Sequence, residues 1–165
     1  MTDNKVIQID FSKKFKTSPN DELVPIAQYV CEILTEKKIK HNIVSPGSLL
    51  VNIGGLSFFF CSSLMSNGGY TYYTQNVNPT GPLDLSKLQD FAKVYTLLDM
   101  ETHFEVRSEE VKFNFEMHLN FDEVQESENI VGKLKQFARS LSRAIVYCEK
   151  YGFEIGGAEP VVFQN

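Results

Sequence analysis

Two adjacent glycines, Gly54-Gly55, separate two apolar runs that span residues 48–53 and 56–63. The central residues of a tight hairpin turn need positive φ angles, which glycine adopts without a Cβ clash. The sequence therefore predicts an antiparallel hairpin in which Ile53 pairs with Leu56.

This pairing determines which side chains share a face of the hairpin, because side chains alternate along a strand. One face should pack in the core and carries three apolar pairs: Ile53 with Leu56, Val51 with Phe58, and Leu49 with Phe60. The second face carries two pairs: Asn52 with Ser57, and Leu50 with Phe59. The solvent-facing side of an antiparallel sheet usually carries polar side chains, so we expect another part of the protein to shield Leu50 and Phe59 from water. We expect a helix to provide it; otherwise this face is an interaction surface.

Further strands follow from the alternation of apolar and polar residues. The clearest covers residues 111–121, and its hairpin partner is predicted at residues 102–107, through a turn at Ser108-Glu109. Shorter strands are predicted at residues 5–11, 42–44 and 70–76. The tyrosines of the 70–76 strand suit a partly covered sheet surface.

Three segments have the three-to-four-residue spacing of an amphipathic helix, and they cover about residues 21–38, 84–99 and 127–152. Residues 18–21 form a capping signal for the first helix, whose regular part Pro25 should delay. Asp84 is a good N-cap for the second helix. Gly152 is typical of the position just after a helix end, so the third helix should stop there.

These patterns predict an α+β fold: an antiparallel β-sheet with flanking helices, in the order β-α-βββ-α-ββ-α with a short C-terminal tail. The length of 165 residues fits a single domain over residues 1–165. Its core should span about residues 21–152, with the 5–11 strand and the 153–165 tail as additions. The tail contains the apolar run Val161-Val162-Phe163, which we expect to be an edge strand or an ordered extension.

The composition disfavours several classes of function. A net charge of −5 and a pI near 5.2 provide no basic footprint for nucleic acid. The longest apolar run, residues 56–61, is far shorter than a membrane-spanning helix, so we expect no membrane insertion. The first residues lack the pattern of a signal peptide, and a cytoplasmic location is expected.

No motif of catalysis or of cofactor binding is present in the sequence, and we expect no enzyme activity, no cofactor and no metal. The three cysteines, Cys31, Cys61 and Cys148, have no C-x-x-C spacing and should be reduced thiols. The three histidines, His41, His103 and His118, have no metal-ligand spacing. A cysteine nucleophile, Cys61 or Cys148, paired with His118 remains an alternative.

The order of the predicted elements resembles the fold of class I type III secretion chaperones and of the related YbjN-like domains. The likeness is greatest in the second half, where a helix over residues 85–98, a hairpin over 103–107 and 111–121, and a helix over 130–151 follow one another. The resemblance implies a small acidic protein, often dimeric, that binds other proteins through exposed hydrophobic grooves and strand edges.

Our leading hypothesis is a non-enzymatic protein-binding module, a chaperone or adaptor, whose partner adds an extended segment to a sheet edge. A homodimer is also compatible with the resemblance. The candidate protein-binding residues are Leu50, Phe59, Tyr73, Val161 and Phe163.

Two other hypotheses stay open. One is a toxin-neutralising or inhibitory protein, whose acidic surface blocks a basic active site. The other is a small cytosolic ligand-binding domain or enzyme with a pocket between sheet and helices, lined by Tyr70, Tyr72 and Tyr95.

Overall fold

The computed structural model describes residues 23–65, 67–79, 81–82, 84–96, 100–107, 110–121 and 127–156. Four features expected from the sequence lie outside these residues: the 5–11 strand, the capping signal at 18–21, the turn at Ser108-Glu109, and the apolar run at 161–163. The described residues share one hydrophobic core, to which all three α-helices and most of the strands contribute.

The described part of the chain forms three α-helices, a short 3-10 helix and seven strands. In chain order these are α1 (Pro25–Glu36), β1 (His41–Ser45), β2 (Ser48–Ile53), β3 (Leu56–Cys61), β4 (Gly68–Pro79), α2 (Leu85–Tyr95), β5 (Met100–Arg107), β6 (Glu110–Asn120), α3 (Ser127–Tyr147), the 3-10 helix η1 (Cys148–Tyr151) and β7 (Phe153–Ile155). The predicted α+β fold with an antiparallel sheet and flanking helices is confirmed.

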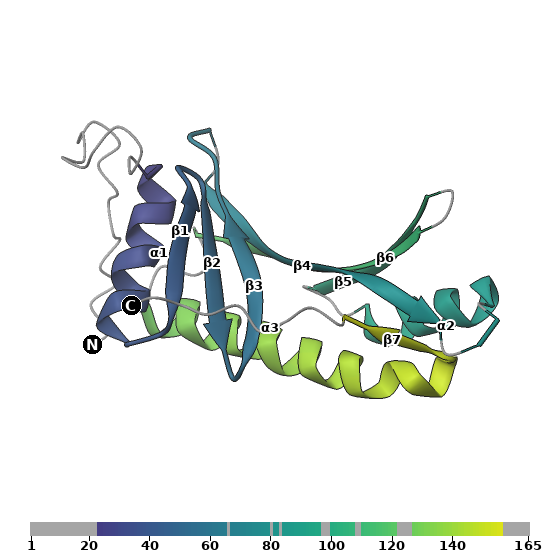
Figure 1. The fold of residues 1–165 in the computed structure, drawn as a ribbon. Coiled ribbons are helices and arrows are strands. Elements are labelled where there is room, and N and C mark those ends of the chain that lie inside the picture. Colours follow the sequence, from purple (N-terminus) through teal and green to yellow (C-terminus); the bar gives the residue numbers. More distant parts are fainter. Residues whose placement is uncertain are drawn as a thin grey trace.

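The strands form one sheet in the order β1-β2-β3-β4-β6-β5, and β7 pairs with the far end of β4 (Figure 1). The predicted register of the glycine hairpin is confirmed, with Ile53 opposite Leu56 and Leu50 opposite Phe59. Both turn glycines have positive φ angles, as the turn requires.

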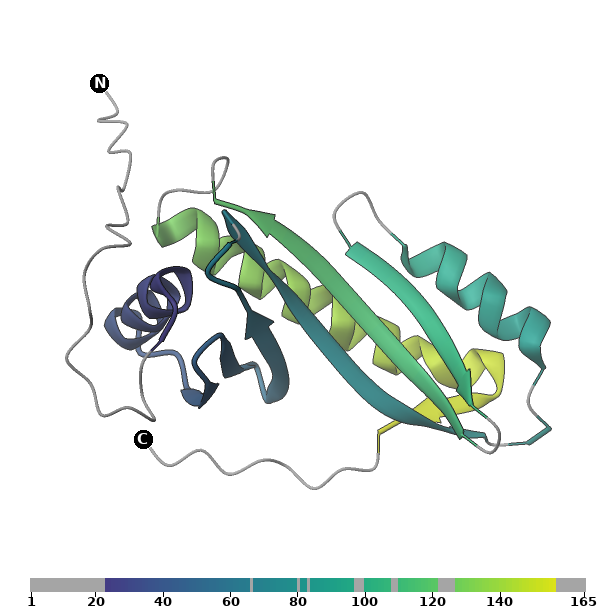
Figure 2. The same cartoon turned by 90° about the horizontal axis from the view of Figure 1, so that it is seen from above.

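The helices pack against one face of this sheet. Seen from above, β4 and β6 lie across α3 (Figure 2), and Phe137 of α3 packs 4.9 Å from Phe58 and 5.1 Å from Phe115 between ring centroids. Helix α1 buries its apolar side against the same core near β2, and α2 packs beside β5 through Phe91. The opposite face of the sheet, which we call the open face, therefore bears none of the core.

Element ends follow local chemistry. Helix α1 begins at Pro25, and Asp84 caps α2 by accepting a hydrogen bond from the Ser86 amide at 2.9 Å, both as predicted. Helix α2 ends at Tyr95, earlier than the predicted Asp99, because Thr96 is extended and its hydroxyl accepts a hydrogen bond from the Thr102 amide at 3.3 Å.

The C-terminal side of α3 also follows the sequence. The α-helix passes into the 3-10 helix η1, which ends at Gly152 with a φ of 85°, as expected of a left-handed cap. The next three residues form β7, a strand that was not predicted from the sequence. The run at 161–163, for which an edge strand was expected, lies outside the described residues.

We expect opposite stability effects from two glycine substitutions. In Gly68→Ala the new Cβ would lie 2.1 Å from the backbone oxygen of Leu119, which should destabilise the fold by about 2 kcal/mol. In Gly132→Ala, inside α3, the new Cβ meets nothing within 4 Å and should stabilise by about 0.5–1 kcal/mol. Chemical denaturation of both variants tests the pair, and a stable Gly68→Ala chain would contradict the close pairing of β4 with β6.

Candidate functional site

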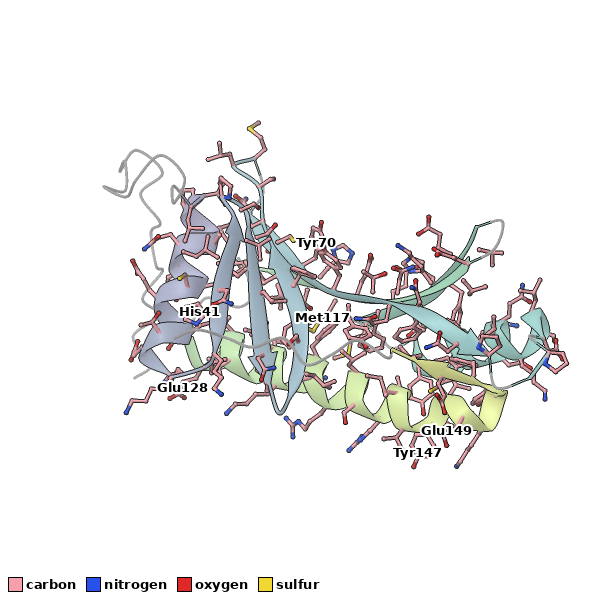
Figure 3. All side chains as sticks on the ribbon, viewed as in Figure 1. His41, Tyr70, Met117, Glu128, Tyr147 and Glu149 are labelled. Atoms are coloured by element: carbon pink, nitrogen blue, oxygen red, sulfur yellow. The ribbon has the colours of Figure 1, made fainter. Side chains whose placement is uncertain are left out.

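The open face is covered by no helix of the described residues. In Figure 3 Tyr70 lies on this side of the sheet, whereas α3 runs along the other side. Our expectation that a helix covers Leu50 and Phe59 is therefore wrong for the described part of the chain. The reason is physical: each of the three described helices already buries its apolar stripe in the single core on the opposite face.

An aromatic patch lies on the open face, and it consists of Leu50, Phe59, Tyr70 and Tyr72. Leu50, Phe59 and Tyr72 are paired in one row across β2, β3 and β4. The Phe59 and Tyr72 rings stack with centroids 5.1 Å apart, and the Tyr70 and Tyr72 rings stack at 5.7 Å. The patch is thus a continuous, rigid surface formed by three neighbouring strands.

The β3–β4 loop carries two further exposed apolar side chains. Leu64 and Met65, three and four residues after the end of β3, expose 67% and 96% of their surface. Tyr70, which begins the patch on the other side of the loop, is 39% exposed. Large exposed apolar side chains make this end of the sheet a candidate interaction surface.

Acidic residues flank the aromatic patch on its β6 side. Glu116 pairs with Tyr72 on β4 and with Glu101 on β5, and Glu105 pairs with Lys112. We call Glu101, Glu105 and Glu116 the acidic strip. The Glu101–Glu116 and Glu105–Lys112 pairs contain three carboxylates and one ammonium group. This part of the open face is therefore net negative.

Cys61 lies beneath the patch. It is buried, its Sγ is 3.2 Å from the Ser48 hydroxyl, and it pairs with Tyr70. Burial, and then the neighbouring Cys61 thiol, raise the pKa of Tyr70 and of Tyr72. Both phenols therefore remain neutral at physiological pH and present hydroxyl groups that donate hydrogen bonds.

The structure does not support the alternative pairing of a cysteine with His118. Strand β4 lies between Cys61 on β3 and His118 on β6, so Tyr70 separates the two side chains in their row. Cys148 lies in the core on the opposite face, where burial raises the pKa of its thiol. Neither thiol is placed as an activated nucleophile.

Tyr73 lies on the core face, away from Leu50 and Phe59. It pairs with Phe115, and its ring meets that of Phe113 edge-to-face at 6.2 Å. Of the candidate binding residues, the structure thus brings together Leu50 and Phe59, whereas Val161 and Phe163 lie outside the described residues. Tyr70 and Tyr72 were not among the candidate binding residues. Their spacing of two residues in one strand, which places both side chains on the same face, could have indicated them.

The structure does not form the tyrosine-lined pocket of the ligand-binding alternative. Tyr70 and Tyr72 belong to the open face, whereas Tyr95 packs 4.6 Å from Phe91 on the helix side of the sheet. Within the described ranges no group of three or more His, Cys, Asp or Glu residues is placed to hold a metal ion. No described helix is long and apolar enough to span a membrane.

Tyr73→Phe should reduce the loss of stability in alkali. Burial, and then Cys148, raise the pKa of Tyr73 from 10.0 to about 12. The unfolded chain therefore ionises first, so the stabilisation is complete below pH 10 and is lost as the pH rises toward 12. The full shift corresponds to about 2.7 kcal/mol, which partial exposure of the ring reduces to about 1–2 kcal/mol.

Denaturant unfolding near pH 8 and pH 11 measures this effect. The control is Tyr147→Phe, because Tyr147 is 41% exposed on α3. An equal alkaline loss in the parent chain and in Tyr73→Phe would contradict the burial of this phenol.

In the described part of the chain, three α-helices against one face of a seven-strand antiparallel sheet form a YbjN-like fold, as the element order led us to expect. The crystal structure of YbjN, described as "a putative transcription regulator from E. coli", is similar over 76% of this chain and 92% of that one, with a TM-score of 0.56 and 14% sequence identity. No protein-family model and no curated protein matches the chain. The likeness establishes the fold.

Proposed function

We propose that this chain is a non-enzymatic protein-binding module, an adaptor or chaperone, whose open face binds a segment of another protein. The observation that carries the proposal is the aromatic patch, which lies on a sheet face without helix cover in the described part of the chain. Stacked aromatic rings on strands lose little conformational entropy when they bind, which is why aromatic residues dominate the energetics of protein interfaces.

The acidic strip defines the chemistry of the partner. A segment that places apolar side chains on Phe59 and Tyr72 would bring its neighbouring residues to Glu116 and Glu101, in the same row. Lysine or arginine at those positions is complementary in charge and also fits beside aromatic rings. The partner segment is therefore apolar and basic.

Binding across the face is better supported than addition to the β1 edge. Ile43 and Val44 on this edge strand are 44% and 55% exposed, which favours a contact. However, the β1–β2 register is irregular between Ile43 and Ser45. A bulge interrupts the ladder that an added strand would continue. Ile43→Lys should therefore leave binding intact.

The non-enzymatic part of the proposal is supported by the same geometry. Tyr70 stands between Cys61 and His118. The Sγ atom of Cys31 lies 3.5 Å from Nε2 of His41, but burial raises the pKa of the Cys31 thiol, which disfavours the reactive thiolate. If a regulatory role like that suggested for YbjN applies here, the acidic strip favours contact with a protein over contact with nucleic acid. The inhibitory alternative would use this same face, with a folded basic cleft in place of a flexible segment.

Selection from a random peptide library on the immobilised full chain tests the proposal. Enriched peptides should combine apolar residues with Lys or Arg, and Leu50→Asp should abolish their capture. The matched control is Val146→Asp, an equally apolar-to-acidic change at a residue that is 67% exposed on α3. If no peptide is enriched, or if Leu50→Asp captures the same peptides as the parent, the open face is not a peptide-binding surface.

Reversing one charge should weaken binding in a salt-dependent way. Glu116→Lys is expected to lower the affinity for an enriched basic peptide by about tenfold, or ~1.4 kcal/mol. Raising the salt from roughly 0.05 M to 0.5 M should weaken the parent more than the variant, because screening removes an attraction that the variant has lost. Calorimetric titration at both salt concentrations measures the difference, and equal salt dependence would exclude a role for the acidic strip.

A further inference from the structure

A second apolar surface lies on the other side of the glycine hairpin. It is a groove of about 500 Å³ between the β2–β3 turn and α3, lined by Ile53, Gly54, Leu56, Lys135, Ala138, Arg139 and Ser142. Figure 1 shows the turn reaching down beside α3. We call this surface the hairpin groove.

The walls of the hairpin groove have a distinct chemistry. Ile53 and Leu56 are half-buried and continue the hydrophobic core, and Ala138 forms the floor from α3. Lys135 and Arg139 stand one helical turn apart on its rim and are exposed. An apolar floor beneath two cations fits an apolar segment that also carries a carboxylate.

The course of the chain after β7 leads toward this groove. β7 runs antiparallel to β4, with Val77 opposite Ile155, and the Gly156 amide then donates to the Asn76 carbonyl at 3.2 Å. A chain that continues in this direction passes along β4 from Asn76 toward Tyr72, where β3 begins to pair through Phe59. Between those points, residues 73–75 of β4 have no strand neighbour on this side within the described part of the chain.

The length of the remaining segment is sufficient. Tyr72 lies four residues from Asn76 on β4, which is about 13 Å of strand. Val161 follows Gly156 by five residues, or up to about 17 Å, and the whole 157–165 segment spans up to about 30 Å. The apolar run can therefore pass the end of the β3–β4 pairing and reach Leu56, which precedes Phe59 by three residues.

The composition of this segment matches the groove. Residues 157–165 read Gly-Ala-Glu-Pro-Val-Val-Phe-Gln-Asn, with three consecutive apolar residues, one carboxylate at Glu159, and no Lys or Arg. The apolar run suits Ile53 and Leu56, and Glu159 suits the two cations of the rim. Pro160 removes one backbone donor, which favours docking by side chains over a continuous added strand.

We propose that the chain's own segment 157–165 folds back along β4 and docks Val161 and Phe163 in the hairpin groove, with Glu159 facing Lys135 and Arg139. Docked in this way, the segment braces the hairpin that carries Leu50 and Phe59 on its other side. This inference concerns a separate surface from the open face, so either can fail without the other.

A single tryptophan can report on the docking, because the natural chain contains none. Phe163→Trp in the full chain should give a blue-shifted emission that is shielded from acrylamide. The emission should not change on dilution, because docking is intramolecular. A concentration-dependent shift would instead show exchange of the segment between two copies, and an emission typical of exposed tryptophan would contradict the proposal.

Two groove variants in the Phe163→Trp background separate docking from other causes of shielding. Leu56→Ser and the rim change Arg139→Glu should each lower the ratio of docked to undocked segment by roughly tenfold. Arg143→Glu is the matched control, because Arg143 is exposed on α3 but does not line the groove. Arg139→Glu alters an exposed side chain and leaves the core intact. This variant therefore still tests the proposal if Leu56→Ser fails to fold. Shielding that both groove variants leave unchanged would overturn the proposal.

Discussion

Phe59→Asp is expected to weaken binding of a basic, apolar peptide by at least about 30-fold, or ~2 kcal/mol, which is the range of an interface hot spot. Phe59 is at the centre of the aromatic patch, opposite Leu50 on one side and Tyr72 on the other. The substitution removes the ring that stacks on Tyr72 at 5.1 Å and adds a charge that would be desolvated under the peptide.

The same substitution should leave the fold in place, because Phe59 is only half-buried and does not belong to the core cluster. Circular dichroism and thermal unfolding check this point, and titration with a labelled peptide measures affinity. Val146→Asp should bind like the parent. If the Phe59→Asp chain is folded and keeps the parental affinity, the aromatic patch does not bind the peptide. Conversion of a parental dimer to a monomer would instead identify a second copy as the occupant.

Phe91→Ala is expected to have the largest effect on stability, a loss of about 3–5 kcal/mol. Phe91 is fully buried on α2. Its ring lies within 6.1 Å, between centroids, of five other aromatic rings: Tyr95, Phe104, Phe113, Tyr151 and Phe153. Truncation leaves a cavity where α2, β5, β6, η1 and β7 meet, and rigid rings cannot collapse to fill it.

Urea denaturation of Phe91→Ala and of Val94→Ala measures this effect on one helix. Val94 is 60% exposed, so its truncation should change the free energy of unfolding by less than about 0.5 kcal/mol. Equal effects of the two substitutions would mean that α2 does not pack on the sheet through Phe91.

The parts of the fold that follow local rules could be predicted from the sequence. The register of β2 with β3 depends on Gly54 and Gly55, whose positive φ angles allow a two-residue turn. The α2 N-cap at Asp84 and the left-handed cap at Gly152 follow likewise from the chemistry of single residues. Each of these features involves residues close in sequence.

Features that depend on distant pairing could not be predicted in the same way. The face to which Tyr73 belongs depends on the pairing of β4 with β6, where Tyr73 lies opposite Phe115. The tyrosine-rich strand alone has no polar alternation that would indicate its core side. That the second face is open could not be predicted for a similar reason, because strand patterns show which side chains share a face but not whether a helix covers it.

The most direct test of the central claim is a map of amide chemical shifts during titration of the isotope-labelled chain with an enriched peptide. If the open face binds the peptide, the changes should concentrate in β2, β3 and the first half of β4, around Leu50, Phe59, Tyr70 and Tyr72, with further changes near Glu116. Changes confined to α3 or to the hairpin groove, with the open face unaffected, would contradict the central claim.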